Sequence, residues 1–164
     1  MKIRPLLKHD LVETIEVIKE SFDISVKPSW SQDAIETFYQ NDLNIDKLGS
    51  LIDNDNICLK YSKGRTIAGV LLFSSKRKLA YLFVAPREYG KGIAKQLFDA
   101  AKLEVDDLVD YIELTSTENA VPAYEKLGFK KSASAFVFND CTFQPMVYWM
   151  GYCRLTKSVD FLRS

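Results

Sequence analysis

A glycine-bearing turn between a strand-like run and a helix carries the residues best suited to holding an anion. Residues 81–84 are apolar or aromatic, Gly90 and Gly92 follow, and a helix is predicted to begin near Ile93. Glycines let a ligand approach the backbone, and the first N–H groups of a helix lie unpaired at the positive end of its dipole. The turn is therefore suited to a phosphate group, with a plain helix-capping turn as the alternative interpretation.

Charged residues balance in number but are segregated along the chain. Lys plus Arg and Asp plus Glu both total 22, which gives no reason to expect a nucleic acid or a membrane surface as partner. Residues 31–56 hold six acids against one lysine, whereas residues 76–95 hold six bases against one glutamate. The basic segment contains the glycine turn, which favours anion binding there.

The length and the cysteine content exclude several classes of protein. A chain of 164 residues with 47% hydrophobic residues fits one folded domain. Cys58, Cys141 and Cys153 lack CxxC spacing, and His9 is the single histidine, so we expect neither a disulfide framework nor a metal site. The sequence has no apolar signal core and no run of about 18 apolar residues, so we expect a cytoplasmic protein without a membrane span.

Helical periodicity dominates the first third of the chain. A short edge strand is predicted over residues 3–6, with helices over 10–22 and from residue 31 onward. Asp10 is expected to be the N-cap of the first helix. Residues 41–56 predict a loop with a helical turn or two around 48–52.

The remaining elements place the glycine turn in the middle of a sheet. Residues 57–62 and 66–73 predict a β-hairpin, and residues 78–84 a third strand. The helix after the turn should bury Ala94, Leu97, Ala101, Val105 and Leu108. A short strand over 111–114, a helix over 119–127 closed by Gly128, and strands over 130–138 and 144–153 joined by Asn139 and Asp140 follow.

We therefore predict an α/β (α+β) fold. It should have a single mixed, mostly antiparallel central sheet of about seven strands flanked by about four helices. The domain is expected to span residues 1–153, and residues 154–164 to form a C-terminal tail.

Two separated motifs and this element order resemble the GNAT superfamily of acyl-CoA-dependent N-acyltransferases over about residues 1–153. Val84-Ala85-Pro86 followed by Tyr89-Gly90-Lys91-Gly92-Ile93-Ala94 is similar to the family's Val-x-Pro and (Arg/Gln)-x-x-Gly-x-(Gly/Ala). Tyr89 departs from the family's Arg or Gln. Residues 119–129 are similar to a second family motif in their Asn119, Tyr124 and Gly128-Phe129.

The resemblance implies acetyl-CoA, or a related acyl-CoA, as the co-substrate. Its diphosphate would bind the N–H groups from Gly90 to Lys95, and its pantetheine arm would pair with the strand ending at Val84. The N–H of Val84 would then stabilise the oxyanion formed on the thioester carbonyl. The expected cofactor-binding residues are Leu82, Phe83, Val84, Tyr89, Gly90, Lys91, Gly92, Ile93, Ala94, Lys95 and Asn119.

Tyr124 is the residue that the resemblance assigns to proton transfer, as the acid that protonates the departing CoA thiolate. A phenol with a pKa of about 10 is protonated at neutral pH. The alternative is a tyrosine that only packs its ring. No general base stands out, the candidates being a water chain and Glu113, Glu20, Asp23, His9 and Tyr81; an acyl-enzyme on Cys141 is disfavoured because nothing nearby in sequence would lower its pKa.

The resemblance implies a primary amine as acceptor, in a groove between the N-terminal helices and the last strands. Those segments supply Phe22, Trp30, Phe38, Tyr39, Phe136, Phe138, Tyr148 and Trp149, most of them expected to be core. The acidic segment 31–56 favours a cationic acceptor: a small amine, an amino acid, a polyamine, or a lysine or N-terminus of a protein.

Two other functions fit parts of the sequence. One is a non-catalytic acyl-CoA-binding module, which the unusual Tyr89 and the absence of an obvious base support. The other is dinucleotide binding, since Gly90-x-Gly92 follows a strand, but the third glycine is missing at Lys95 and the preceding hairpins do not suit a βαβ unit. The sequence does not determine the oligomeric state, and a homodimer is among the states it allows.

Overall fold

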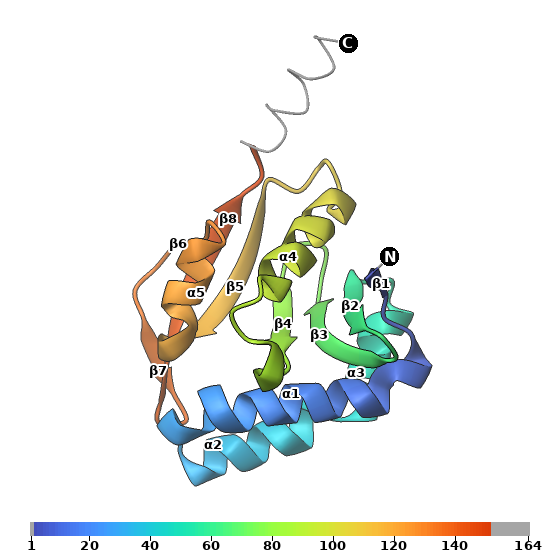
Figure 1. The fold of residues 1–164 in the computed structure, drawn as a ribbon. Helices are drawn as coiled ribbons and strands as arrows, with labels where there is room; N and C mark the ends of the chain where they lie inside the picture. Colours follow the sequence, from blue (N-terminus) through green and yellow to red (C-terminus); the bar gives the residue numbers. More distant parts are fainter. Residues whose placement is uncertain (1, 152–164) are drawn as a thin grey trace.

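Two antiparallel sheets that diverge from a shared edge form the centre of the computed structural model, which describes residues 2–151 (Figure 1). The first sheet has the order β1 (Ile3–Pro5), β2 (Cys58–Lys63), β3 (Thr66–Phe73) and β4 (Leu79–Val84). The second sheet has the order β5 (Tyr111–Thr117), β8 (Cys141–Trp149) and β6 (Lys130–Lys131), and β7 (Phe136–Phe138) also pairs with β8.

The two sheets meet where β4 begins. An isolated parallel bridge joins Lys78 to Glu113, and the Glu113 N–H donates to the Arg77 carbonyl at 2.8 Å. Beyond that bridge, no ladder between β4 and β5 is formed within residues 2–151, and the strands separate towards Val84 and Thr117 (Figure 1). The predicted fold class is confirmed. The difference is that eight described strands form two sheets, which leaves an opening beside the end of β4.

Five α-helices cover these sheets within the described residues. They are α1 (Leu11–Ser25), α2 (Gln32–Thr37), α3 (Ile45–Asp53), α4 (Ile93–Glu104) and α5 (Val121–Lys126). Short 3-10 segments occur at Lys8–Asp10, Lys27–Ser29, Pro86–Glu88 and Glu118–Ala120, and Phe38–Asp42 is a π-helical segment, η3. One face of the first sheet packs on α4, and the opposite face packs on α1 and α3.

The helix α4 packs closely on β3 because β3 contains a glycine at the contact. A Cβ on Gly69 would lie 2.9 Å from Ile93 Cγ2, so only glycine fits without a shift. The predicted inner face is confirmed for Leu97, Ala101 and Val105. It is wrong for Leu108, which is 87% exposed because the helix already ends at Glu104.

The helix α1 is anchored to the first sheet by two carboxylates. Asp10 is the N-cap residue of α1, as predicted, but its side chain makes no hydrogen bond to the helix amides. Its carboxylate accepts from Lys60 Nζ at 2.7 and 2.8 Å and from the Leu7 N–H at 2.9 Å instead. Glu13 Oε1 accepts from the Ile67 N–H at 2.6 Å, beside a register shift in the β2–β3 ladder. These bonds place α1 along the sheet that ends in the glycine turn.

The C-terminal half differs from the predicted elements in its boundaries. The strand β5 extends to Thr117, beyond the predicted end at Leu114, and the predicted strand 130–138 is divided into β6 and β7. The turn at Asn139 and Asp140 is confirmed, with φ of 50° and 59° as a tight hairpin turn requires. The predicted end of the last strand at Cys153 and the predicted tail lie outside the described residues.

Candidate active site

The glycine turn exposes a set of unpaired backbone amides. Gly90 and Gly92 have φ of 76° and 77°, in the left-handed region, and Gly92 is the N-cap of α4. Among the described residues, no side chain caps this helix, and the first of its amides to donate to the backbone is that of Gln96, to the Gly92 carbonyl at 3.1 Å. A Cβ on Gly90 would meet no atom within 4 Å. The amides from Gly90 to Lys95 are therefore open to a ligand.

The backbone of β4 also presents unpaired groups to the opening. The Ala85 N–H donates to the Ala68 carbonyl at 2.8 Å, and Val84 is opposite Gly69. In an antiparallel ladder hydrogen-bonded pairs alternate with non-hydrogen-bonded pairs. The N–H and C=O groups of Leu82 and Val84 therefore point away from β3, whereas the backbone of Phe83 is paired with Val70. Phe83 contributes its side chain to the site and not its backbone.

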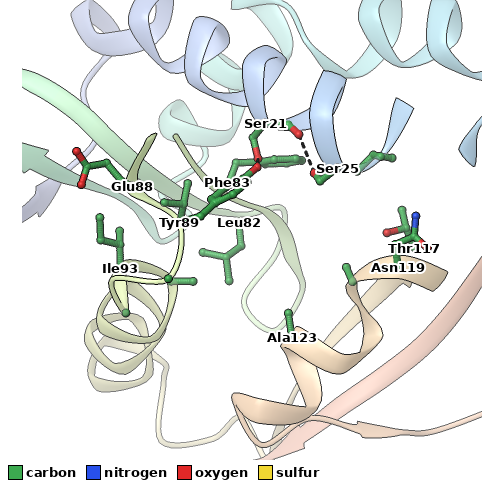
Figure 2. Close-up of a pocket in the computed structure, with 16 residues that line it drawn as sticks. Ser21, Ser25, Leu82, Phe83, Glu88, Tyr89, Ile93, Thr117, Asn119 and Ala123 are labelled. Carbon is green, nitrogen blue, oxygen red and sulfur yellow. Dashed lines mark hydrogen bonds between the residues drawn. The ribbon is translucent and has the colours of Figure 1, made fainter. Parts of the chain in front are cut away.

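These groups border a single cleft of about 400 Å³ that passes between the ends of β4 and β5 (Figure 2). It is lined by Ser21, Ser25, Val26, Leu82, Phe83, Val84, Glu88, Tyr89, Gly90, Gly92, Ile93, Ala94, Thr117, Asn119, Ala120 and Ala123. Nine of the predicted site residues are in this lining, and Lys91, Lys95 and Tyr124 are not. The lining also contains Ser21, Ser25 and Thr117, which were not predicted because serines on a helix face and a threonine in a strand carry no motif.

The side chains of Lys91 and Lys95 are bound to carboxylates of the protein. Lys91 Nζ lies 2.9 Å from Glu88 Oε2, and Lys95 Nζ lies 2.6 Å from Asp99 Oδ2. Glu88 is buried and also accepts from Lys63 Nζ at 3.1 Å; its two lysine partners lower the pKa of its carboxyl group. Glu88 thereby ties the turn to the end of β2.

Tyr89 occupies the position where the first motif departs from its usual form, and its hydroxyl lies 2.7 Å from Ser21 Oγ. Ser21 is buried on α1, and both residues line the cleft (Figure 2). The hydrogen bond connects the helix α1 to the glycine turn across 68 residues of sequence.

The family model described as an acetyltransferase (GNAT) domain matches residues 26–149, which include the cleft from β4 to α5. The chain belongs to the GNAT acetyltransferase family. No curated protein matches its sequence.

Solved structures of GNAT proteins share the fold of this chain. A PaiA N-acetyltransferase from Thermoplasma acidophilum in complex with coenzyme A has 23% identity and a TM-score of 0.76, covering 90% of this chain and 97% of that one. A GCN5-related N-acetyltransferase from Rhodopseudomonas palustris has 16% identity and a TM-score of 0.77, covering 90% and 94%. The ribosomal-protein-S18-alanine N-acetyltransferase from Escherichia coli has 15% identity and a TM-score of 0.65, covering 90% and 92%.

The described part of this GNAT chain offers neither a metal site nor a membrane-spanning helix. Within residues 2–151, no group of three or more His, Cys, Asp or Glu side chains is placed to hold a metal ion. None of the helices in the same range combines the length and the apolar character that crossing a bilayer demands. The antiparallel first sheet also contradicts the dinucleotide interpretation, which requires a parallel βαβ unit.

Tyr124 lies on α5 next to the cleft but outside its lining. Its half-buried ring packs edge-on against Phe129 with the ring centroids 5.7 Å apart, and its neighbour Ala123 reaches the cleft. Burial raises the pKa of the Tyr124 phenol to about 12. The phenol is therefore protonated at every physiological pH.

The candidate bases named from the sequence do not line the cleft. Tyr81 donates its hydroxyl to the Asp42 carbonyl at 2.6 Å, and burial raises its pKa, which removes it as a base. Asp23 accepts from the Tyr39 hydroxyl, and Glu20 lies 3.9 Å from Arg87. His9 is exposed beside Asp10, Glu113 lies on β5 at the bridge to Lys78, and Cys141 is 2% exposed. Glu88, the one carboxylate among the lining residues, is occupied by Lys63 and Lys91.

Proposed function

We propose that this protein is an N-acetyltransferase that transfers the acetyl group of acetyl-CoA to a primary amine by direct attack. The observation that carries the proposal is the arrangement of two sets of unpaired backbone groups around one cleft. The amides at the start of α4 and the outward-facing groups of Leu82 and Val84 border it together. The first set suits a diphosphate, and the second suits the amides of a pantetheine arm.

In the proposed reaction the amides of Gly90 to Lys95 bind the diphosphate, and β4 aligns the thioester so that its carbonyl oxygen accepts from the Val84 N–H. The neutral amine attacks the carbonyl carbon, and the negative charge that develops on the oxygen is stabilised by that N–H. The C–S bond then breaks with its electron pair on sulfur, and Tyr124 donates its proton to the thiolate. Asn119 and Tyr89 contact the co-substrate from the two ends of the cleft.

The cationic nitrogen formed by the attack loses its proton to water, because the carboxylate in the lining is already paired, and water returns a proton to the Tyr124 phenolate. The route of the amine to the thioester is the α1 side of the cleft, where Ser21, Ser25 and Val26 line the opening. The acidic segment 31–56 lies in the helices on that side and favours a cationic acceptor: a small amine, an amino acid, a polyamine, or an amino group of a protein.

A thiol-release assay with acetyl-CoA and a panel of amines tests the proposal. Tyr124→Phe is expected to lower kcat by about 100-fold, as the loss of an acid catalyst does. Its affinity for CoA, measured by calorimetry, should be unchanged. Tyr111→Phe is the matched control. The Tyr111 ring packs on Trp149, with the ring centroids 5.5 Å apart, and it does not line the cleft.

The second candidate function is a non-catalytic acyl-CoA-binding module. It is favoured by the position of Tyr124 outside the cleft lining and by the pairing of Glu88 with two lysines. Tight CoA binding together with no thiol release from any amine would support it and contradict the enzyme.

A further inference from the structure

An aromatic recess of about 110 Å³ lies between α2, η3 and the β7–β8 hairpin, apart from the cleft lining. Its walls are the rings of Trp30, Phe38, Phe138 and Phe143. The Trp30 ring is edge-on to Phe38 at 6.1 Å and to Phe143 at 5.7 Å. The hairpin reaches the start of α2 (Figure 1), where Ser31 Oγ donates to the Asn139 carbonyl at 3.2 Å. A hydrogen bond and ring contacts therefore join the β7–β8 hairpin to the segment around α2 that forms the other wall of the recess.

One carboxylate, that of Asp42, lies in this recess without a partner. Among the described residues, its side chain accepts no hydrogen bond and has no cationic group within 4.0 Å. It is half-buried, and burial raises the pKa of its carboxyl group, with Lys47 opposing the shift from a distance. A desolvated carboxylate without a partner is costly to the fold, and such groups gather at binding sites.

The recess is close to the proposed reaction centre. Phe83 and Val26 line the cleft, and both pack in the aromatic cluster that contains Trp30 and Phe38. The Asp42 carbonyl accepts from Tyr81, which precedes Val84 by three residues on β4. At about 3.3 Å per residue Tyr81 and Val84 are on the order of 10 Å apart along the strand, and the Tyr81 side chain spans the further distance to Asp42.

We propose that this recess binds a non-reacting alkylammonium group of the acceptor, an inference that rests on the proposed function of the cleft. The faces of aromatic rings attract cations, and a carboxylate among such rings adds a direct ionic partner. The same faces disfavour an anion. An acceptor with a second cationic centre would be held at Asp42 while its primary amine reaches the thioester.

The lysines near Asp42 make an anionic ligand the main alternative. Lys47 and Lys78 line a larger recess of about 270 Å³ that shares Phe38 and Asp42 with the aromatic one. Both lysines are exposed, so water solvates their ammonium groups, whereas Asp42 lies deeper. The binding experiment therefore includes an anion.

The first test measures binding without acetyl-CoA. Choline and its neutral isostere 3,3-dimethyl-1-butanol are titrated against a Trp149→Phe background, in which the fluorescence change reports on Trp30. Choline should bind at least about five-fold more tightly than the isostere, and Asp42→Asn should remove the preference. Asp46→Asn, which changes an exposed carboxylate outside both recesses, is the control and should keep it. Phe138→Ala removes an exposed ring of the recess and keeps Asp42, so it is a second variant that should weaken choline binding.

Equal binding of choline and the isostere, a preference that survives Asp42→Asn, or tighter binding of butyrate than of choline would overturn the inference. The second test compares diamines with monoamines of the same length in the thiol-release assay. Asp42→Asn should raise the ratio of diamine KM to monoamine KM by about ten-fold. If no amine is acetylated, the proposed function fails, and the choline titration still decides the inference about the recess.

Discussion

Tyr89 stands at the motif position where the GNAT pattern has Arg or Gln, and it makes a contact of its own. Its hydroxyl reaches Ser21 on α1 at 2.7 Å, so the turn before α4 is held by a helix that is distant in sequence. The bond is partly buried, and both residues border the cleft. The hydrogen bond therefore holds the residue before Gly90 against α1.

Tyr89→Phe is expected to weaken CoA binding by about 3- to 10-fold, the effect of losing one hydrogen bond of about 1 kcal/mol. Ser21→Ala should have a similar effect, and the double variant should be little weaker than either single one, because both remove the same bond. Calorimetry with CoA measures all three dissociation constants. Ser50→Ala, which loses only the bond that its hydroxyl accepts from Asn54 Nδ2 at the end of α3, is the control, because neither residue lines the cleft. If the fold-changes in the dissociation constant of the two single variants multiply in the double variant, the two hydroxyls act separately and the prediction is wrong.

The raised pKa of Tyr124 makes a prediction about the pH profile. A phenol with a pKa of about 12 is still protonated at pH 10, so the acid form is not depleted as the solution becomes alkaline. The amine, by contrast, becomes neutral and reactive as the pH rises. We expect kcat/KM to rise and then level off, without a falling limb below about pH 10. A fall between about pH 8 and pH 10 would identify a different acid.

The turn and α4 act together as an element, and Gly92 is the point where they join. Gly92 and Gly64 have φ of 77° and 63°, and an added Cβ would meet no atom closer than 4.0 Å at either position. An alanine at either place should cost about 1–2 kcal/mol of stability through its left-handed conformation alone. Only Gly92→Ala should also weaken CoA binding, by about ten-fold or more, since its methyl group enters the ligand's approach. Equal CoA affinities of the two variants in calorimetry would argue against the turn as the diphosphate site.

For the molecule as a whole, buried tyrosines predict a loss of stability at alkaline pH. Burial raises the pKa of Tyr124 to about 12, and burial together with a hydrogen bond to Asp23 raises the pKa of Tyr39 to about 12. Burial also raises the pKa of Tyr81. The pKa of each tyrosine in the folded chain is above the ordinary value of 10.0. Their contribution to the free energy of unfolding is therefore complete below pH 10 and is lost as the pH rises towards 12. The urea midpoint should fall between about pH 10 and pH 11. Tyr124→Phe should reduce the slope, and an unchanged slope would show that Tyr124 is not desolvated in the folded chain.

The amino-acid sequence alone was sufficient for the features that depend on neighbouring residues. Leu97 and Ala101 revealed the buried face of α4 through their spacing, and Gly90 and Gly92 marked the turn because few other residues adopt its backbone angles. The Asn139–Asp140 turn could be located for the same reason. Local conformational preferences act over one or two turns of chain, so each of these could be inferred from a short window.

The site itself depends on contacts that no short window contains. The separation of β4 from β5 follows from which strands pair, the Ser21–Tyr89 bond spans 68 residues, and Asp42 meets Phe138 and Phe143 only when the hairpin folds against η3. Leu108 was misjudged because the end of α4 is set by packing, and the carboxylate of Asp10, the N-cap of α1, binds Lys60 instead of the helix amides. Side-chain partners are chosen by the three-dimensional approach of distant segments, and the periodicity of a sequence does not specify that approach.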